Sequence, residues 1–120
     1  MSPPTISANL LRLPEFVIST DKIFSIYHTD RVDEMVIRIR DEVETAAKIN
    51  GSVYRVVGFD TECNWKGVYK DRVALIQIAT LESVYLFHIK SILNQNRLPD
   101  SLALLLKDFD IKKVITLSSF

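Results

Sequence analysis

The chain has 120 residues, of which 48% are hydrophobic and 25% are charged, so it fits one globular domain or part of one. Its formal net charge of zero excludes a strong overall attraction to nucleic acid and leaves only local basic patches for that task. A single cysteine, Cys63, excludes an intrachain disulfide framework. No apolar stretch is long enough to span a bilayer and no secretory signal is seen, so we expect an intracellular protein without membrane contact.

The first part of the chain predicts a loose arm and two short strands. Residues 1–14 contain three prolines, which oppose regular structure, and we expect them to form a flexible N-terminal arm. Runs rich in strand-forming residues follow at 16–18 and 23–27. Between them, Thr20 and Asp21 have the side-chain chemistry of a turn.

Residues 30–49 predict an amphipathic helix, because apolar residues recur there at three- and four-residue spacing. We expect Thr29 or Asp30 to cap its first turn and Gly51 to follow its end. The charged residues off the apolar stripe are interpreted as a solvated face whose salt bridges contribute little to stability: Arg38, Arg40, Asp41, Glu42 and Glu44.

The second part of the chain predicts strands at 53–60, 73–79 and 83–87, a helix at 99–108 and a final strand at 113–117. The connection between the second and third of these strands is short, which favours an antiparallel hairpin. The first two are almost continuously apolar, which predicts central positions with burial on both faces. The order of the elements indicates an α/β domain with a mixed sheet.

Two carboxylates lie at the end of the first of these strands. Asp60 and Glu62 lie two residues apart, and because side chains alternate along a strand, both project from the same face. Oxygen ligands at a strand end suit hard divalent cations such as Mg²⁺. A solvated strand end is the other interpretation, and the Asp-x-Glu triplet alone is too common to decide between them.

A basic and aromatic loop comes directly after the carboxylates. Its side chains either stack on bases and contact phosphates or belong to an ordinary exposed loop: Trp65, Lys66, Tyr69, Lys70 and Arg72. Thr61 and Gln77 are further candidates for contact with nucleic acid, although a hydrogen-bonded core amide is the simpler interpretation of Gln77.

The two histidines and the cysteine predict no site of their own. His28 and His88 have no partner at ligand spacing, so we interpret them as structural histidines whose hydrogen bonds are satisfied. Cys63 is expected to fill a small buried space beside Glu62.

Four segments in order resemble the opening of a 3′–5′ exonuclease domain of the DEDD type, closest to the Werner-type exonucleases: 59–62, 73–79, 84–87 and 102–114. The resemblance covers about residues 50–115. It implies a ribonuclease-H-like fold, a mixed sheet with flanking helices, truncated here after the fourth core strand. Residues 15–120 would then form a partial exonuclease domain.

The resemblance also implies a chemistry. In that family the first motif gives an aspartate and a glutamate to a two-metal site, and Asp60 and Glu62 match it. Mg²⁺ or Mn²⁺ is the cofactor and the 3′ end of DNA or RNA is the substrate. Later motifs add two aspartates and a tyrosine or histidine, and nothing matches them: residues 115–120 differ, and Asp108 and Asp110 precede the last strand.

With two carboxylates, we expect weak capture of one ion and little or no nuclease activity from the chain alone. The alternative is a non-catalytic nucleic-acid-binding or regulatory module derived from the same fold. Because the helices that cover the sheet in the family are missing, an apolar face would be left open to aggregation or to a protein partner.

Overall fold

The computed structural model describes residues 20–49, 51, 54–63 and 73–115. The expected arm at 1–14, the run at 16–18 and the basic loop therefore lie outside the described residues. The elements are η1 (Thr20–Lys22), β1 (Ile23–Ile26), η2 (Thr29–Arg31), α2 (Val32–Ile49), β2 (Arg55–Cys63), β3 (Val73–Ala79), β4 (Val84–His88), α3 (Ile89–Ile92), α4 (Asp100–Lys107) and β5 (Ile111–Ile115).

The described strands form one mixed sheet in the order β1-β4-β3-β2-β5. β3 is antiparallel to both of its neighbours, whereas β1 is parallel to β4 and β5 is parallel to β2. Four strands therefore run in one direction and β3 alone runs in the other. The predicted mixed sheet, the β3–β4 hairpin and the inner positions of β2 and β3 are all confirmed.

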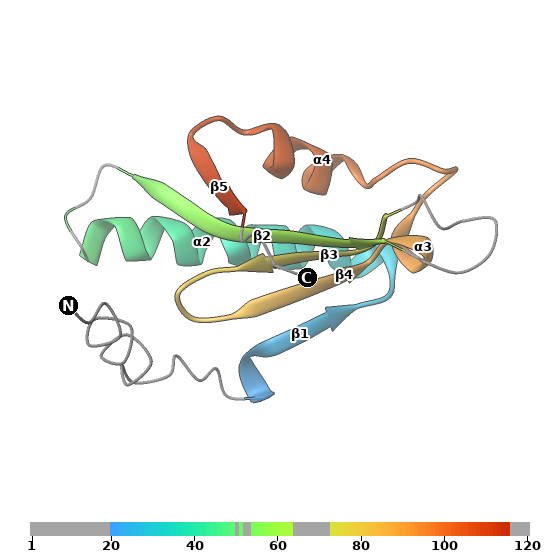
Figure 1. Ribbon diagram of the computed structural model, residues 1–120, viewed down its shortest axis with the longest axis horizontal. Coiled ribbons are helices and arrows are strands. Elements are labelled where there is room, and N and C mark those ends of the chain that lie inside the picture. The colour runs from blue at the N-terminus through green and yellow to red at the C-terminus, as the bar shows by residue number, and fades with distance from the viewer. Residues whose placement is uncertain (1–19, 50, 52–53, 64–72, 116–120) are drawn as a thin grey trace, which may run out of the picture.

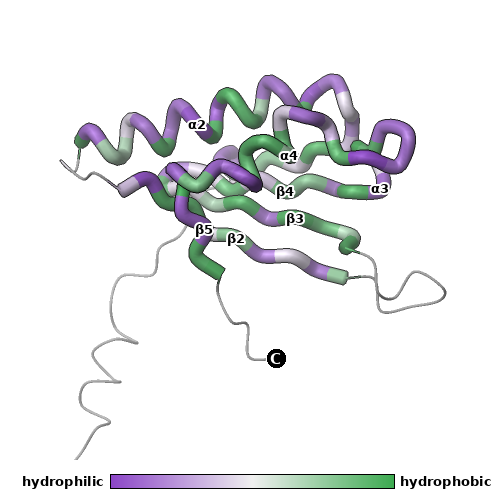
Figure 2. The backbone as a smooth tube through the Cα atoms, turned by 90° about the horizontal axis from the view of Figure 1, so that it is seen from above, coloured by the Kyte–Doolittle hydropathy of each residue, from purple (hydrophilic) through white to green (hydrophobic). Residues whose placement is uncertain are grey.

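Both α2 and α4 lie on the same face of the sheet, and they contact each other there (Figures 1 and 2). Side chains from these two helices, from the short helix α3 and from one face of the sheet form the hydrophobic core: Ile26, Val32, Met35, Val36, Ile39, Val43, Val57, Ile76, Ile78, Tyr85, Phe87, Ile89, Ile92, Leu102, Leu105 and Ile111. Because side chains alternate along each strand, the other half of them points to the opposite face.

We call that opposite side of the sheet the open face. Among the described residues it carries Ser25, Val56, Gly58, Asp60, Glu62, Leu75, Gln77, Leu86, His88 and Val114. Val57 is buried, but its neighbour Val56 remains 44% exposed. The prediction that β2 is buried on both faces is therefore wrong, because the described helices cover only one of them.

Helix α2 follows its predicted apolar stripe, and Gly51 adopts a left-handed conformation after its end, with φ of 61°. Its beginning differs from the prediction, because the short turn η2 precedes it. The Thr29 hydroxyl donates to the carbonyl oxygen of Ile92 at 3.0 Å. Thr29 thus ties the start of α2 to α3, a short helix that the sequence pattern did not predict.

The carboxylate of Glu42 fixes α2 to the β3–β4 hairpin. It accepts hydrogen bonds from the hydroxyls of Thr80 at 2.9 Å, Ser83 at 3.1 Å and Tyr85 at 2.7 Å. The Glu42 side chain is only 11% exposed, and Arg38 lies 3.5 Å from it. The interpretation of Glu42 as part of a solvated face is therefore wrong, because the hairpin places three hydroxyls against it.

Two other residues of that supposed solvated face make contacts across the fold. Arg40 pairs with Asp108, which follows α4, at 2.8 Å. Glu44 accepts two hydrogen bonds from Arg55 at the start of β2. These partners are distant in sequence, so helical spacing alone did not predict them.

Four strands have boundaries that differ from the predicted ones. β1 ends at Ile26 instead of residue 27, and β4 is Val84–His88 instead of 83–87. β2 continues three residues beyond 60, because β3 supplies backbone partners as far as Cys63. β5 begins at Ile111, two residues earlier than predicted, because it pairs in parallel with β2 from Arg55 onward. Helix α4 lies within the predicted range, and Pro99 occupies its N-cap position.

The turn between α3 and α4 is the basis of a first prediction. Asn94 and Arg97 exchange two backbone hydrogen bonds, and the central residues Gln95 and Asn96 have φ of 50° and 62°. Two positive φ angles suit a tight hairpin turn that favours asparagine and glycine. We expect Gln95→Asn to raise the free energy of unfolding by about 0.5 kcal/mol, measured by urea denaturation. Gln95→Ala is the matched control and should give no gain; an equal gain would contradict the explanation.

The Glu42 cluster is the basis of a second prediction. Burial and the hydrogen bond to the Glu42 carboxylate raise the pKa of Tyr85 to about 12 from its ordinary value of 10.0. The unfolded chain therefore loses this proton first, and the stability held by Tyr85 is present below pH 10 and lost as the pH rises toward 12. Urea denaturation across this range should show wild type losing more stability than Tyr85→Phe. Parallel losses would contradict the assignment.

Candidate functional site

Asp60 and Glu62 both lie on the open face, near the C-terminal end of β2. Phe59 packs against the core and Asp60 follows it, so the alternation of the strand directs Asp60 and then Glu62 away from the helices. Asp60 is half-buried and Glu62 is exposed. The two carboxylates are thus on one face, two positions apart, and solvent reaches both.

An irregularity in the β2–β3 pairing follows Glu62 directly. Glu62 pairs with Leu75, but Cys63 pairs with Val73, so Ala74 has no partner in β2. Such a bulge increases the local twist of a strand and redirects the side chains beside it, and bulges are frequent next to functional sites. Here it follows the second carboxylate and precedes the end of β2.

The two carboxylates have few partners within the described part of the chain. An oxygen of Asp60 accepts a hydrogen bond from the backbone N–H of Thr61 at 2.9 Å. Neither Asp60 nor Glu62 forms an ion pair with another described residue. No described cation therefore neutralises their negative charges, which is the electrostatic condition for attracting a metal ion.

The donor set for a metal is incomplete among the described residues, which contain no group of three or more His, Cys, Asp or Glu side chains that could hold an ion. Asp60 and Glu62 supply hard oxygen ligands and two negative charges. That set suits one divalent cation that keeps most of its water, and it does not suit a pair of metal ions.

The structure separates the other predicted site residues into three groups. Gln77 pairs with Asp60 across the sheet, so its half-buried side chain lies on the open face beside the carboxylates. Thr61 pairs with the buried Ile76, so its side chain projects from the opposite side. The remaining predicted contacts lie outside the described residues: Trp65, Lys66, Tyr69, Lys70 and Arg72.

His88 belongs to the same face, although sequence reasoning treated it as structural. It ends β4 and pairs with Leu75, which in turn pairs with Glu62, so the three residues form one row across the sheet. Its Nε2 atom is buried without a hydrogen-bond partner among the described residues. The prediction of a fully satisfied histidine is therefore wrong. Side chains alternate along β4, so His88 lies on the same face as Val84 and Leu86 and away from the buried Tyr85 and Phe87. That alternation was the signal in the sequence that could have found it.

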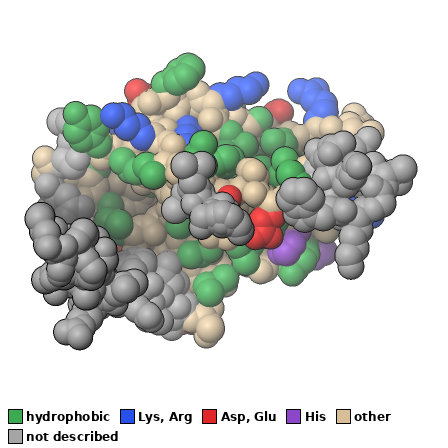
Figure 3. All heavy atoms as spheres, viewed as in Figure 1, with side chains coloured by type: hydrophobic (Ala, Val, Ile, Leu, Met, Phe, Trp, Pro, Cys, Tyr) green, Lys and Arg blue, Asp and Glu red, His purple; other side chains and the backbone are tan. Residues whose placement is uncertain are grey.

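Tyr27 stacks on His88, with ring centroids 4.0 Å apart and an interplanar angle of 12°. Tyr27 follows β1 and keeps 50% of its surface exposed. Figure 3 shows this side of the molecule, where acidic and histidine side chains lie close together among hydrophobic ones. Sequence reasoning missed Tyr27, because its partner is 61 positions away in the chain.

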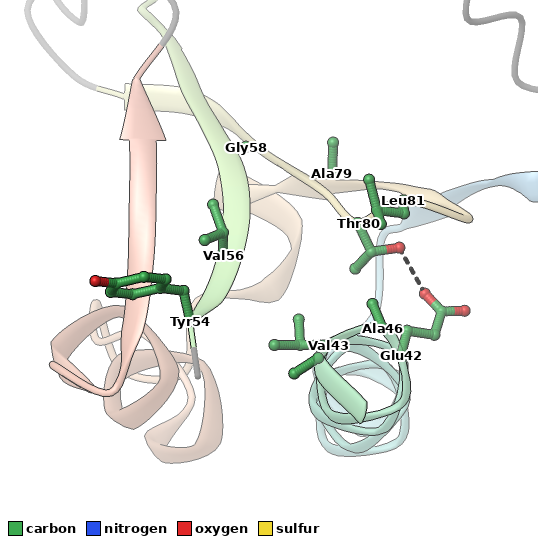
Figure 4. A pocket seen from close by; sticks show the side chains of 10 residues that line it. Glu42, Val43, Ala46, Tyr54, Val56, Gly58, Ala79, Thr80 and Leu81 are labelled. Atoms are coloured by element: carbon green, nitrogen blue, oxygen red, sulfur yellow. Dashed lines mark hydrogen bonds between the residues drawn. The ribbon is translucent and has the colours of Figure 1, made fainter. Parts of the chain in front are cut away.

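A pocket of about 470 Å³ lies at the other end of β2, between that strand, α2 and the β3–β4 turn (Figure 4). Its lining is mostly apolar and includes Val43, Ala46, Val56 and Leu81. Its acidic residue, Glu42, is already bonded to Thr80. The described residues that line the pocket therefore offer no free carboxylate.

Comparison with known proteins gives a fold. No family model and no curated protein matches the chain. The exonuclease domain of EXD2 matches with a TM-score of 0.62 and 21% identity over 77% of this chain and 43% of that one. The same domain soaked in Mg and GMP matches with a TM-score of 0.59 and 22% identity over 77% of this chain and 42% of that one. The Aedes aegypti Nibbler EXO domain matches with a TM-score of 0.57 and 20% identity over 85% of this chain and 42% of that one.

The chain has the ribonuclease-H-like exonuclease fold. The resemblance to 3′–5′ exonuclease domains that the sequence suggested is thus supported by structure, and the predicted fold class is confirmed. The chain spans less than half the length of the solved domains that it matches.

In the described part of the chain, no helix combines the length and the apolar character needed to cross a membrane.

Proposed function

We propose that the chain is part of a 3′–5′ exonuclease domain of the DEDD type, in which Asp60 and Glu62 supply half of the acidic ligands for Mg²⁺ or Mn²⁺. One observation carries the proposal: two carboxylates that have no ion-pair partner among the described residues lie together on the open face of a sheet with the exonuclease fold. The substrate class is the 3′ end of a DNA or RNA strand.

The proposal includes inactivity of the chain on its own. A two-metal site polarises the scissile phosphate and generates the attacking hydroxide, and it requires several anionic ligands. The described residues provide only Asp60 and Glu62 at this place. The missing ligands must come from outside the described residues, or from another molecule.

Val56 and Val114 support a partner or a further segment over the open face. Val114 pairs with Gly58, the second residue after Val56, so the two valines lie near each other on the open face. They are 44% and 54% exposed. Covering apolar surface of this kind lowers the free energy of the protein in water.

A third prediction concerns metal binding. We expect Mn²⁺ to bind weakly, with a dissociation constant on the order of 1 mM, because two carboxylates leave most of the coordination sphere to water. Paramagnetic broadening in ¹⁵N-correlated spectra should centre on the amides near Asp60 and Glu62. The double variant Asp60→Asn, Glu62→Gln should abolish it, and Glu34→Gln on the exposed surface of α2 should not. Broadening that survives the double variant would place the ion elsewhere.

A fourth prediction concerns catalysis. With Mg²⁺ or Mn²⁺ and an end-labelled single strand, the purified chain should show no trimming above the level of the Asp60→Ala variant, because the ligand set is incomplete. Resolution of the products on a sequencing gel measures this. Robust 3′ trimming that disappears in Asp60→Ala would overturn the proposed inactivity while supporting the proposed metal site.

A non-catalytic nucleic-acid-binding or regulatory module is the second candidate function. The incomplete ligand set among the described residues favours it. Binding to a single strand that weakens steeply with salt, without any cleavage, would support the module, because release of counterions from phosphates drives such binding.

A further inference from the structure

The stacked pair of Tyr27 and His88 combines a fixed ring contact with solvent exposure. Tyr85 and Phe87 on the same sheet are fully buried and belong to the core. Tyr27 is held against a neighbouring ring at 4.0 Å, yet half of its surface stays in solvent. A ring that is fixed on one side and exposed on the other presents a rigid, flat surface.

The directions of the strands place this surface beside the two carboxylates. β1, β2 and β4 all run the same way, so Tyr27 after β1, His88 at the end of β4 and Glu62 near the end of β2 meet at one end of the sheet. In open α/β sheets, ligands bind outside the C-terminal ends of the strands. Glu62 and His88 are two strand spacings apart, about 10 Å, and Tyr27 lies one strand further, about 14 Å from Glu62. A short stretch of single strand can span that separation.

We propose that the exposed ring of Tyr27 is a stacking surface for a nucleobase of the strand whose phosphate lies at Asp60 and Glu62. His88 is a positioning residue that holds the Tyr27 ring. Aromatic stacking suits any base, because every base has a π face, so this contact would bind single strands with little sequence preference. The inference rests on the proposed function and names a nucleic-acid contact that the metal site does not require.

Another exposed aromatic residue provides a matched control. Phe109 is 98% exposed, but it precedes β5, at the opposite end of the sheet from Tyr27. A contact that depends on general stickiness of exposed rings would involve both residues. A contact that depends on the place beside the carboxylates would involve Tyr27 alone.

The test measures binding of a fluorescent single-stranded oligonucleotide to the purified chain in Mg²⁺, by anisotropy. Tyr27→Leu should weaken binding about tenfold, the loss expected for one base stack. Tyr27→Phe keeps the ring and should stay within about twofold of wild type, as should Phe109→Leu. No measurable binding by wild type, an unchanged affinity in Tyr27→Leu, or an equal loss in Phe109→Leu would overturn the inference.

A second measurement removes the base instead of the ring. An oligonucleotide with an abasic 3′-terminal residue should bind wild type about tenfold more weakly than the intact oligonucleotide does. The Tyr27→Leu variant should bind the abasic and the intact oligonucleotide with nearly the same affinity. Coupled losses of this kind require contact between the base and Tyr27. Losses that simply multiply would overturn the inference, even if Tyr27→Leu were partly unfolded.

The role of His88 has its own readout. His88→Phe preserves a flat ring beneath Tyr27 and should retain the affinity, whereas His88→Leu should reduce it and should shift the Tyr27 ring resonances in the absence of ligand. Equal loss in both variants would overturn the positioning role. Mn²⁺ broadening at Asp60 and Glu62 reports separately on the metal site, so failure of the stacking contact is distinguishable from failure of the proposed function.

Discussion

The carboxylate of Glu42 is the interaction on which the arrangement of this fold depends. It gathers the hydroxyls of Thr80, Ser83 and Tyr85 from the β3–β4 hairpin and fixes them to the middle of α2. A carboxylate that is almost buried requires such donors, because an unpaired charge in the interior is costly. The cluster therefore holds α2 on the face of the sheet that carries the core, and the opposite face stays open.

The open face carries the carboxylates of the candidate site because the described helices cover the other face. Asp60 and Glu62 lie on the side of β2 away from the helices, where their charges are unneutralised by other described residues. Among the described strands β3 alone runs against the others, so the last residues of β1, β2 and β4 meet at one end of the sheet. Carboxylates and an exposed aromatic stack are thereby brought to the same end of the sheet.

The comparisons and the site give different kinds of information. Likeness to the EXD2 and Nibbler exonuclease domains, at 20–22% identity, establishes the fold. The residues decide what the fold can do, because function depends on the site and not on the architecture. Two carboxylates are enough to attract a cation, but the described residues do not complete the set that phosphodiester hydrolysis by two metals requires.

The sequence by itself determined the helix α2, the β3–β4 hairpin and the shared face of Asp60 and Glu62. Side chains repeat about every 3.6 residues in a helix and every 2 in a strand, so these features depend only on neighbouring residues. Only the tertiary structure decided the burial of Glu42, the one-sided cover of β2 and the stack of Tyr27 on His88. Glu42 and Tyr85 are 43 positions apart, and Tyr27 and His88 are 61 apart. Contacts at such separations depend on how the elements dock, and no local pattern records them.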